Sequence, residues 1–442
     1  MRVALVHDWI TGMRGGERCL AEFLALYPEA DIYTLVHEPG TTTQAIDNRV
    51  RGTSWLQRFP RLRKRYRLFL PLFPLLARSI QLRDYDLVIS LSHAVAKNVS
   101  CHNVSCHICY CFTPMRYIWD MAPFYLGKTV ATFCAPLIWM LRKWDRNGAR
   151  GVTRFVGISH FIAARIRKFY GRRADVLYPP VVEQWERVTT DCELSAQVSQ
   201  RKEAGYFLYA GAFVPYKGVE HIIEAFNELN LPLLCVGSGP LESSLRKKAG
   251  ENISFLGGVS DEQLGALYRN ARALIFPAKE DFGIIPIEAL LSGTPVIAGY
   301  HGATRETVPG WRWWLEEKWD PASHAGIFFP LRKKGRLQGE SDYPRLLVEA
   351  VQRFLEIEDT VRQETAIEAG EKFSLAVFRE GWSRILQQEG LVSVADGNVV
   401  DIQGVATERS NVVAGGSQKR CSPDAGHHVE VEGKNGEVAT GC

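Results

Sequence analysis

Short apolar segments of strand length alternate with amphipathic segments of helix length along most of this 442-residue chain. In the first half, the apolar periodicity predicts strands at residues 2–7, 32–36, 87–91, 108–112 and 155–158, and helices over 17–27 and from the Ser159 cap to Tyr170. Strands that alternate with helices form a parallel sheet with helices on both faces. The first half therefore predicts a doubly wound α/β domain.

The same alternation restarts after a polar, weakly patterned stretch. We expect strands at 206–210, 232–236, 253–256, 273–276 and 295–298, and helices over 218–229, 241–249, 261–270 and 286–291. This pattern predicts a second doubly wound domain, so the two domains face each other across a cleft, where ligands usually bind.

The predicted organisation has five parts: a first domain (1–183), a linker (184–203), a second domain (204–373), a helix that crosses back to the first domain (374–390) and a tail (391–442). The tail is rich in Gly, Ser, Asn, Val and charge and poor in aromatic residues and leucine, so we expect it to be disordered. The apolar segments 68–77 and 129–141 are interrupted by prolines, and we interpret them as buried or interfacial rather than membrane-spanning.

Basic residues gather in one part of the first half. Residues 51–83 contain nine Lys or Arg and no Asp or Glu, although the net charge of the chain is only +4. Between Arg58 and Arg67 the cations alternate with aromatic and leucine side chains, which suits docking on an anionic membrane surface. A solvated basic helix is the alternative. Nucleic acid is a weaker third interpretation, because no recognised binding motif accompanies the charge.

Cysteine usage and the N-terminus both favour a cytoplasmic protein. The ten cysteines do not make a disulfide framework in a chain this long, and residues 3–6 are too short for the core of a secretion signal. Four cysteines and two histidines between 101 and 111 raise the alternative of a metal site, but their spacing fits no zinc pattern well. We expect Cys109 and Cys111 to pack in a buried strand.

The segment from Phe276 to Ala289 carries the strongest chemical signal. We expect a strand to end at Phe276 and a helix to begin at Pro286, with Glu280 in the loop and Glu288 in the first helical turn. The unpaired N–H groups of residues 283–285 would form an anion site, and a carboxylate one turn further can accept hydroxyl groups of a sugar. The alternative is two solvated acids near a helix start, a position that also favours acids.

This segment resembles the E-x7-E motif of glycosyltransferase family 4, whose members are retaining enzymes with the GT-B fold. Further blocks that match the family in order and spacing are residues 215–218, 236–240, 255–257 and 289–298. Residues 7–17, 86–97 and 113–120 are similar to a mannosyltransferase-like branch used in bacterial surface polysaccharide synthesis. The resemblance extends over residues 2–388 and leaves out the tail.

The resemblance implies a metal-independent hexosyltransferase without a cofactor, acting at the inner face of the plasma membrane. Its donor would be a nucleotide sugar, with GDP-mannose favoured, and its acceptor a lipid-linked sugar or a polysaccharide. Glu280 would lie beside the transferred sugar, Lys217 would stabilise the leaving diphosphate and Glu288 would bind the ribose. The resemblance also implies that the backbone of Phe282, Gly283, Ile284 and Ile285 binds the donor. Gly12, Gly15 and Gly16 would let the backbone of the first domain approach the phosphates or the acceptor closely, and His93 would act in the acceptor cleft. A plain strand-to-helix turn and a structural histidine are the alternatives for the last two.

Two positions depart from the family pattern. Ala212 stands where the family usually has Arg, and Phe112 stands where it often has His. Arg116 and Arg305 are candidates to replace the lost polar groups. The departures motivate a second hypothesis, a catalytically weak partner that binds nucleotide sugars or membranes in an assembly. A sugar-nucleotide epimerase is a third hypothesis, which the basic stretch and the E-x7-E pattern disfavour.

Overall fold

The computed structural model describes residues 1–59, 66–122, 127–181, 205–330, 332–333, 336–337 and 342–391. The expected linker at 184–203 and the expected tail beyond residue 391 lie outside these ranges, as does the greater part of the basic stretch between Arg58 and Arg67. Among the described residues, no helix is both long enough and apolar enough to cross a membrane.

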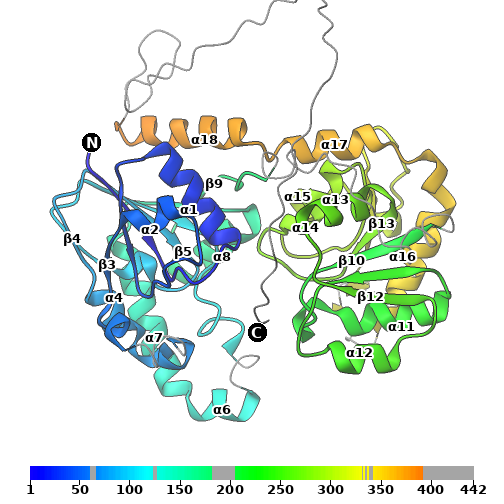
Figure 1. Ribbon diagram of the computed structural model, residues 1–442, viewed down its shortest axis with the longest axis horizontal. Helices are drawn as coiled ribbons and strands as arrows, with labels where there is room; N and C mark the ends of the chain where they lie inside the picture. Colours follow the sequence, from blue (N-terminus) through cyan, green and yellow to red (C-terminus); the bar gives the residue numbers. More distant parts are fainter. Residues whose placement is uncertain are drawn as a thin grey trace, which may run out of the picture.

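The first domain is built on a seven-stranded sheet in the order β3-β2-β1-β5-β7-β8-β9, in which every pair of neighbours is parallel (Figure 1). The strands are β1 (Val3–His7), β2 (Asp31–Thr34), β3 (Val50–Thr53), β5 (Leu87–Ser92), β7 (Cys106–Cys111), β8 (Arg154–Gly157) and β9 (Asp175–Val176). The helices are α1 (Gly15–Leu26), α2 (Gln44–Arg49), α4 (Phe73–Arg78), α6 (Lys128–Phe133), α7 (Ala135–Gly148) and α8 (His160–Tyr170), and β4 (Gln81–Arg83) and β6 (Ser100–His102) form a separate parallel pair. Strands β1, β5 and β7 are buried along their whole length, as expected of a sheet covered on both faces.

The second domain repeats this architecture with six parallel strands in the order β12-β11-β10-β13-β14-β15. The strands are β10 (Tyr206–Ala210), β11 (Leu233–Val236), β12 (Ile253–Gly257), β13 (Ala271–Phe276), β14 (Val296–Gly299) and β15 (Gly326–Phe329). The helices are α11 (Val219–Leu229), α12 (Glu242–Lys248), α13 (Asp261–Arg269), α14 (Ile284–Leu291), α15 (Thr304–Thr307), α16 (Tyr343–Ile357) and α17 (Gln363–Glu371), and β16 (Arg332–Lys333) pairs with β17 (Arg336–Leu337). In chain order the main sheet runs 3-2-1-4-5-6, the order of dinucleotide-binding folds.

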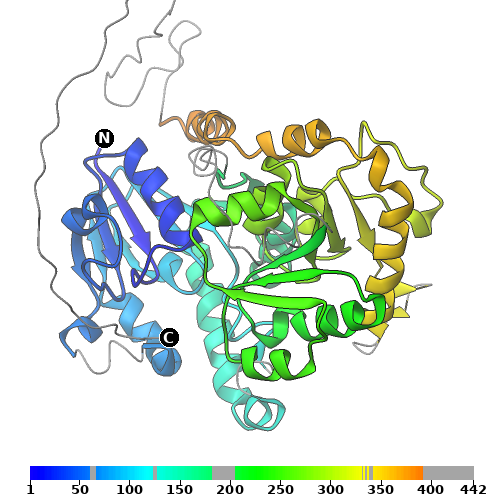
Figure 2. The ribbon, with the colours of Figure 1, turned by 45° about the vertical axis from the view of Figure 1, so that its right-hand side comes forward.

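The last helix, α18 (Leu375–Gln388), leaves the second domain and lies along the first (Figures 1 and 2). The indole N–H of Trp382 donates a 2.8 Å hydrogen bond to the hydroxyl of Tyr27, and Phe378 packs against Phe23 of α1. Both aromatic residues of α18 belong to the buried cluster that also contains β1, β5 and β7. The helix is therefore part of the first domain's core.

The α/β class and the doubly wound sheets are confirmed, but two predicted helix starts are wrong. Helix α1 begins at Gly15, and α14 begins at Ile284, so each starts two residues earlier than expected. Pro286 is consequently the third residue of α14 and not the first. It is tolerated there because the first N–H groups of a helix have no intrahelical partner. Gly283 precedes the helix with a φ of 85°, a left-handed conformation that glycine adopts without strain.

Candidate functional site

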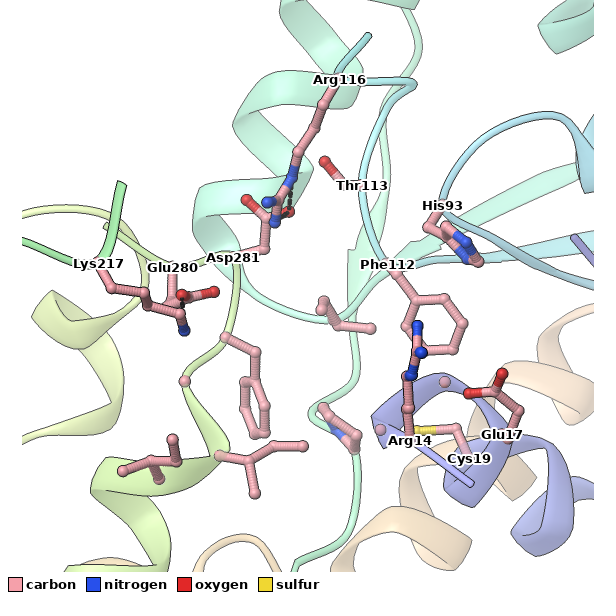
Figure 3. A pocket seen from close by; sticks show the side chains of 18 of the residues that line it. Arg14, Glu17, Cys19, His93, Phe112, Thr113, Arg116, Lys217, Glu280 and Asp281 are labelled. Atoms are coloured by element: carbon pink, nitrogen blue, oxygen red, sulfur yellow. Dashed lines mark hydrogen bonds and ion pairs between the residues drawn. The ribbon is translucent and has the colours of Figure 1, made fainter. Parts of the chain in front are cut away.

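A cavity of about 570 Å³ lies between the two domains at the carboxyl ends of their strands (Figure 3). The first domain contributes the start of α1, His93 after β5 and Phe112 after β7. The second domain contributes Lys217 and the loop that follows β13. Open α/β sheets bind ligands at the carboxyl ends of their strands, so this cavity is the candidate site.

Lys217 and Glu280, the two residues expected at the reacting groups, form an ion pair in the cavity wall (Figure 3). Lys217 ends a short 3-10 turn, and Gly218 follows it with a φ of 70°. The side chains of the pair are 16% and 17% exposed, so each is largely shielded but still reachable from the cavity. A cation and a carboxylate are thus held together where a charged ligand would enter.

Residues 301–303, which were not predicted from the sequence, contact the backbone of the loop that carries Glu280. The amide of Ala303 donates a 3.0 Å hydrogen bond to the carbonyl of Glu280. Gly302 lies so close that a Cβ atom there would be 2.5 Å from the same carbonyl oxygen. His301 is hydrogen bonded at 2.9 Å to the carbonyl of Pro277, and burial lowers its pKa to about 4. The glycine in residues 301–303 was the available signal, since glycine often marks a close backbone approach.

Two helix N-termini, one from each domain, meet at the cavity. Phe282, Gly283, Ile284 and Ile285 line it at the start of α14, and Gly15 and Gly16 line it in the first turn of α1. A Cβ atom on Gly15 would be 3.0 Å from the side chain of Ile284, so this glycine lets the domains approach closely. The first N–H groups of both helices and their positive dipole ends favour an anion between them. Gly12, also expected here, lies outside the cavity wall.

His93 lines the cavity and is held in place by Asp8. The buried carboxylate of Asp8 accepts hydrogen bonds from the amides of residues 93–96 at 2.5–2.9 Å, and one of its oxygens lies 3.2 Å from Nδ1 of His93. Successive amides that converge on one anion fix the backbone of such a loop. His93 was predicted from the sequence, but Asp8 was not. The sequence pattern that could have indicated Asp8 is an acidic residue directly after a buried strand.

Glu288 lies behind the cavity wall, in the second turn of α14. Its side chain is 9% exposed, and the hydroxyl of Tyr268 donates a long, 3.4 Å hydrogen bond to it. Burial raises the pKa of Glu288 to about 7, with the charge of Arg18 on α1 acting in the opposite direction. Arg18 also lies 3.9 Å from Asp261 of α13, so the carboxylate sits where α1, α13 and α14 come together.

At one side of the cavity, Arg116 and Asp281 bring the two domains into direct contact. The carboxylate of Asp281 accepts hydrogen bonds from Arg116 at 3.0 Å (Figure 3) and from Arg165 at 3.1 Å. The carbonyl of Asp281 accepts a hydrogen bond from the Ser159 hydroxyl at 2.6 Å. Glu306 of α15 accepts hydrogen bonds from the amides of residues 160 and 161, at the N-terminus of α8. Carboxylates of the second domain therefore bind arginines of the first domain and the N-terminus of its helix α8.

The residues proposed to replace the missing Arg and His differ in position. Arg116 lines the cavity but is paired with Asp281. The guanidinium of Arg305 lies 4.6 Å from the ring centre of Tyr300, and Arg305 is not part of the cavity wall. Arg14, which the sequence analysis missed, is exposed at the N-cap of α1 and lines the cavity opposite Lys217 (Figure 3). Phe112 lines the cavity, whereas Ala212 does not.

Metal-binding groups are not assembled in the part of the chain that the structure describes: no three His, Cys, Asp or Glu side chains lie together in a suitable arrangement. Cys106, Cys109 and Cys111 are free thiols, all buried in β7. The prediction that Cys109 and Cys111 lie in a buried strand is confirmed.

Comparison with known proteins gives this geometry a context. Residues 192–326 match the family model for glycosyl transferases group 1. The chain is 32% identical over 130 residues to the O-antigen chain mannosyltransferase C of Escherichia coli, covering 28% of this chain and 35% of that protein. It is 28% identical over 189 residues to the GDP-mannose-dependent alpha-(1-6)-phosphatidylinositol monomannoside mannosyltransferase of Mycobacterium tuberculosis, covering 36% of this chain and 49% of that protein. The matched part is thus a third to a half of the length of these curated relatives.

A solved structure extends the comparison to both domains. The Anabaena protein HepE, in complex with UDP, superposes with a TM-score of 0.58 on 88% of this chain and 100% of its own, at 15% identity. At this identity the likeness concerns the fold alone. The chain has the GT-B fold, and its resemblance to glycosyltransferases with mannosyltransferase relatives is confirmed.

Proposed function

We propose that this chain, which has the GT-B fold and a segment matching glycosyl transferases group 1, is a retaining, metal-independent glycosyltransferase. It transfers a hexose, mannose from GDP-mannose, to a lipid-linked or polysaccharide acceptor of a bacterial cell-surface glycan. The observation that carries the proposal is the Lys217–Glu280 pair, which faces the N-terminus of α1 across one cavity. The GDP-mannose-dependent relative supports the choice of donor.

The charges in the cavity suit the breaking of a sugar–phosphate bond. As this bond breaks, negative charge grows on the leaving diphosphate and positive charge grows on the sugar carbon. Lys217 and the N–H groups at the starts of α1 and α14 stabilise the diphosphate, and the Glu280 carboxylate stabilises the sugar. The ion pair holds these opposite charges in contact with each other. A bound diphosphate would share Lys217 with Glu280.

The remaining predicted residues fit around this centre. Glu288, on α14 behind the cavity wall, lies beside Tyr268 and Arg18 and would reach the ribose hydroxyls if these side chains moved. His93, fixed by Asp8, faces the cavity from the first domain, where the acceptor would enter. No resident metal or cofactor has a role in this proposal, because cationic and N–H groups serve the diphosphate. The basic stretch near Arg58 would bring the protein to the cytoplasmic face of an anionic membrane.

Transfer from a nucleotide sugar tests the proposal directly. Purified protein with GDP-mannose and a lipid-diphosphate-linked acceptor should release GDP and form a product that keeps the α configuration, measured by NMR. Glu280→Gln, which preserves shape but removes charge, should lower kcat by about 100-fold. The matched control is Glu364→Gln, an exposed acid on α17. If no GDP-, UDP- or ADP-sugar raises the melting temperature at millimolar concentration, the proposal fails.

The alternative of a catalytically weak assembly partner rests on Phe112, an apolar side chain that lines the cavity where a polar one is usual. A nucleotide sugar would then bind without turnover. Turnover that disappears in Lys217→Ala, while the donor still stabilises the variant, would eliminate this alternative. Stabilisation by the donor without any GDP release from the wild type would favour it.

A further inference from the structure

Helices α6 and α7 carry large apolar side chains that are exposed to solvent. The exposed fraction is 85% for Phe133, 65% for Trp139, 53% for Met140 and 50% for Val130. Single exposed apolar residues are ordinary on protein surfaces, but a contiguous group marks an interaction site. We call these four residues the apolar tip.

The apolar tip is additional to the surface that α7 already buries. Ile138 and Leu141 point inward and are nearly fully buried, which satisfies the packing of this helix on the domain. Trp139 and Met140 lie on the outward side of α7. The exposed Lys143 follows them by four and three residues, so it lies on the same face of the helix. The outward side is therefore apolar at the start of the helix and basic toward its end.

Neighbouring elements extend this surface. Leu75 of α4 is 55% exposed, and Phe73 and Leu76 of the same helix share a buried cluster with Ile138 and Leu141 of α7. Figure 1 places α4 beside α7 at one end of the first domain, with α6 beyond them. Figure 2 shows the same helices projecting below the first sheet. The apolar tip and Leu75 thus belong to one end of the molecule.

The charges around the apolar tip are of one sign. Residues 121–144 contain no Asp or Glu, and neither do residues 51–83. Asp145 is fully buried in an ion pair with Lys97, so it does not offset the exposed Lys143 and Arg150. The ammonium of Lys143 lies 5.4 Å from the ring centre of Trp139, which keeps a cation over an exposed aromatic ring. Among the described residues of α6 and α7, the exposed charged side chains are cations, and this charge complements anionic headgroups better than a protein surface of mixed charge.

We propose that α6 and α7 dock the first domain on an anionic lipid bilayer, with Phe133 and Trp139 entering the interface and Lys143 and Arg150 among the headgroups. This inference rests on the proposed function, because it brings a lipid-linked acceptor to the cavity. Ten residues, 118–127, separate Tyr117 in the cavity wall from the start of α6. The docking surface and the acceptor side of the cavity are therefore joined by one short segment.

Vesicle sedimentation of the full chain, without nucleotide sugar, tests the docking surface. The protein should bind vesicles that contain phosphatidylglycerol and bind poorly to phosphatidylcholine alone. The pair Phe133→Ser and Trp139→Ser should weaken binding about tenfold or more, because two interfacial apolar groups are lost. The matched control is Leu355→Ser with Ile367→Ser, which are exposed apolar residues of the second domain.

Charge is tested separately from apolar contact. Lys143→Gln with Arg150→Gln should weaken binding about thirtyfold, at about 1 kcal/mol for each lost cation, and this loss should shrink as salt is added. The control is Lys247→Gln with Lys318→Gln, two exposed lysines of the second domain. Melting temperatures of all variants establish that they fold, and the basic stretch near Arg58 is unchanged in each.

Three outcomes would overturn the docking proposal. Binding to neutral vesicles as strong as to anionic ones is the first, and binding that the tip variants leave unchanged is the second. The third is a dimer in light scattering that Phe133→Ser with Trp139→Ser dissolves, since the tip would then join two copies of the chain. Stabilisation by GDP-mannose is measured on the same samples, so a failure of the proposed function appears independently of vesicle binding.

Discussion

Among single residues, Arg14 is the best candidate to replace the arginine that the family usually has at the position of Ala212. It lines the cavity from the first domain, whereas Arg116 is engaged by Asp281 and Arg305 lies against Tyr300. We expect Arg14→Ala to lower kcat for transfer by about 100-fold, the effect of losing one charged group at the leaving diphosphate. Steady-state kinetics check this, with Arg14→Lys partly active and Arg305→Ala close to wild type. A larger loss in Arg305→Ala than in Arg14→Ala would contradict the assignment.

Glu288 should make the stability of the protein, measured without a nucleotide sugar, depend on pH. Burial raises its pKa from 4.5 to about 7, so the folded protein holds a proton in this window that the unfolded chain releases. The free energy of unfolding therefore falls as the pH rises from about 4.5 to about 7. Glu288→Gln removes this loss, so the variant should gain up to about 3 kcal/mol relative to wild type between about pH 5 and about pH 8.

Denaturation of both proteins across this pH range measures the gain. The same Glu288→Gln variant should lose most of the stabilisation by GDP-mannose, because a neutral amide is a weaker acceptor for ribose hydroxyls. A variant that gains stability and still responds fully to the donor would place the ribose elsewhere.

The residue types of the site could be predicted, but their pairing could not. Lys217, Glu280 and His93 were predicted and line one cavity, because their motifs lie at the carboxyl ends of strands. The partner of His93, Asp8, is 85 residues away in the chain and meets it only because β1 and β5 are neighbours. Arg14 carried no signal of its own, since an exposed arginine in a glycine-rich loop is ordinary.

Among the elements, helix α8 of the first domain has its N-terminus bonded by a carboxylate of the second domain. Glu306 accepts hydrogen bonds of 2.7 and 2.9 Å from the amides of His160 and Phe161, where a helix favours negative charge. Glu306→Ala should remove about 1 kcal/mol of stabilisation from this helix end, and hydrogen exchange of these two amides should become several-fold faster. Hydrogen exchange by NMR or mass spectrometry measures it. Unchanged exchange would mean that the helix end is satisfied without the second domain.

Element boundaries show where local pattern and tertiary structure diverge. Strand β10 matches its predicted bounds, and helix α18 lies within two residues of the predicted 374–390 at either end, because each combines a full apolar pattern with clear ends. Helix α14 starts early because Gly283, in a left-handed conformation, already turns the chain, so Pro286 falls within the first turn. Strand β15 was missed, although β8, β11 and β14 are equally short and were predicted.

At the scale of the whole molecule, the domains are coupled by α18, which continues the chain of the second domain but belongs to the core of the first. Trp382 is 2% exposed, packs at 4.8 Å on the ring of Phe23 and donates to the hydroxyl of Tyr27. Two similar parallel sheets could be predicted from the repeated alternation. The cleft between them could be predicted from the same pattern, but the contacts that shape it, such as that of Asp281 with Arg116, could not.

Truncating Trp382 should therefore destabilise the first domain, although this residue comes after the second domain in the chain. We expect Trp382→Ala to cost about 3–5 kcal/mol and to lower the first domain's calorimetric transition by on the order of 10 °C. Trp382→Phe should cost about 1 kcal/mol, since it keeps the packing and loses the hydrogen bond. Val377→Ala, on the exposed side of α18, is the control. The second domain's transition, identified by its rise with GDP-mannose, should stay in place. If both transitions fall together, α18 joins the domains into one cooperative unit, and closure of the cavity is then part of folding.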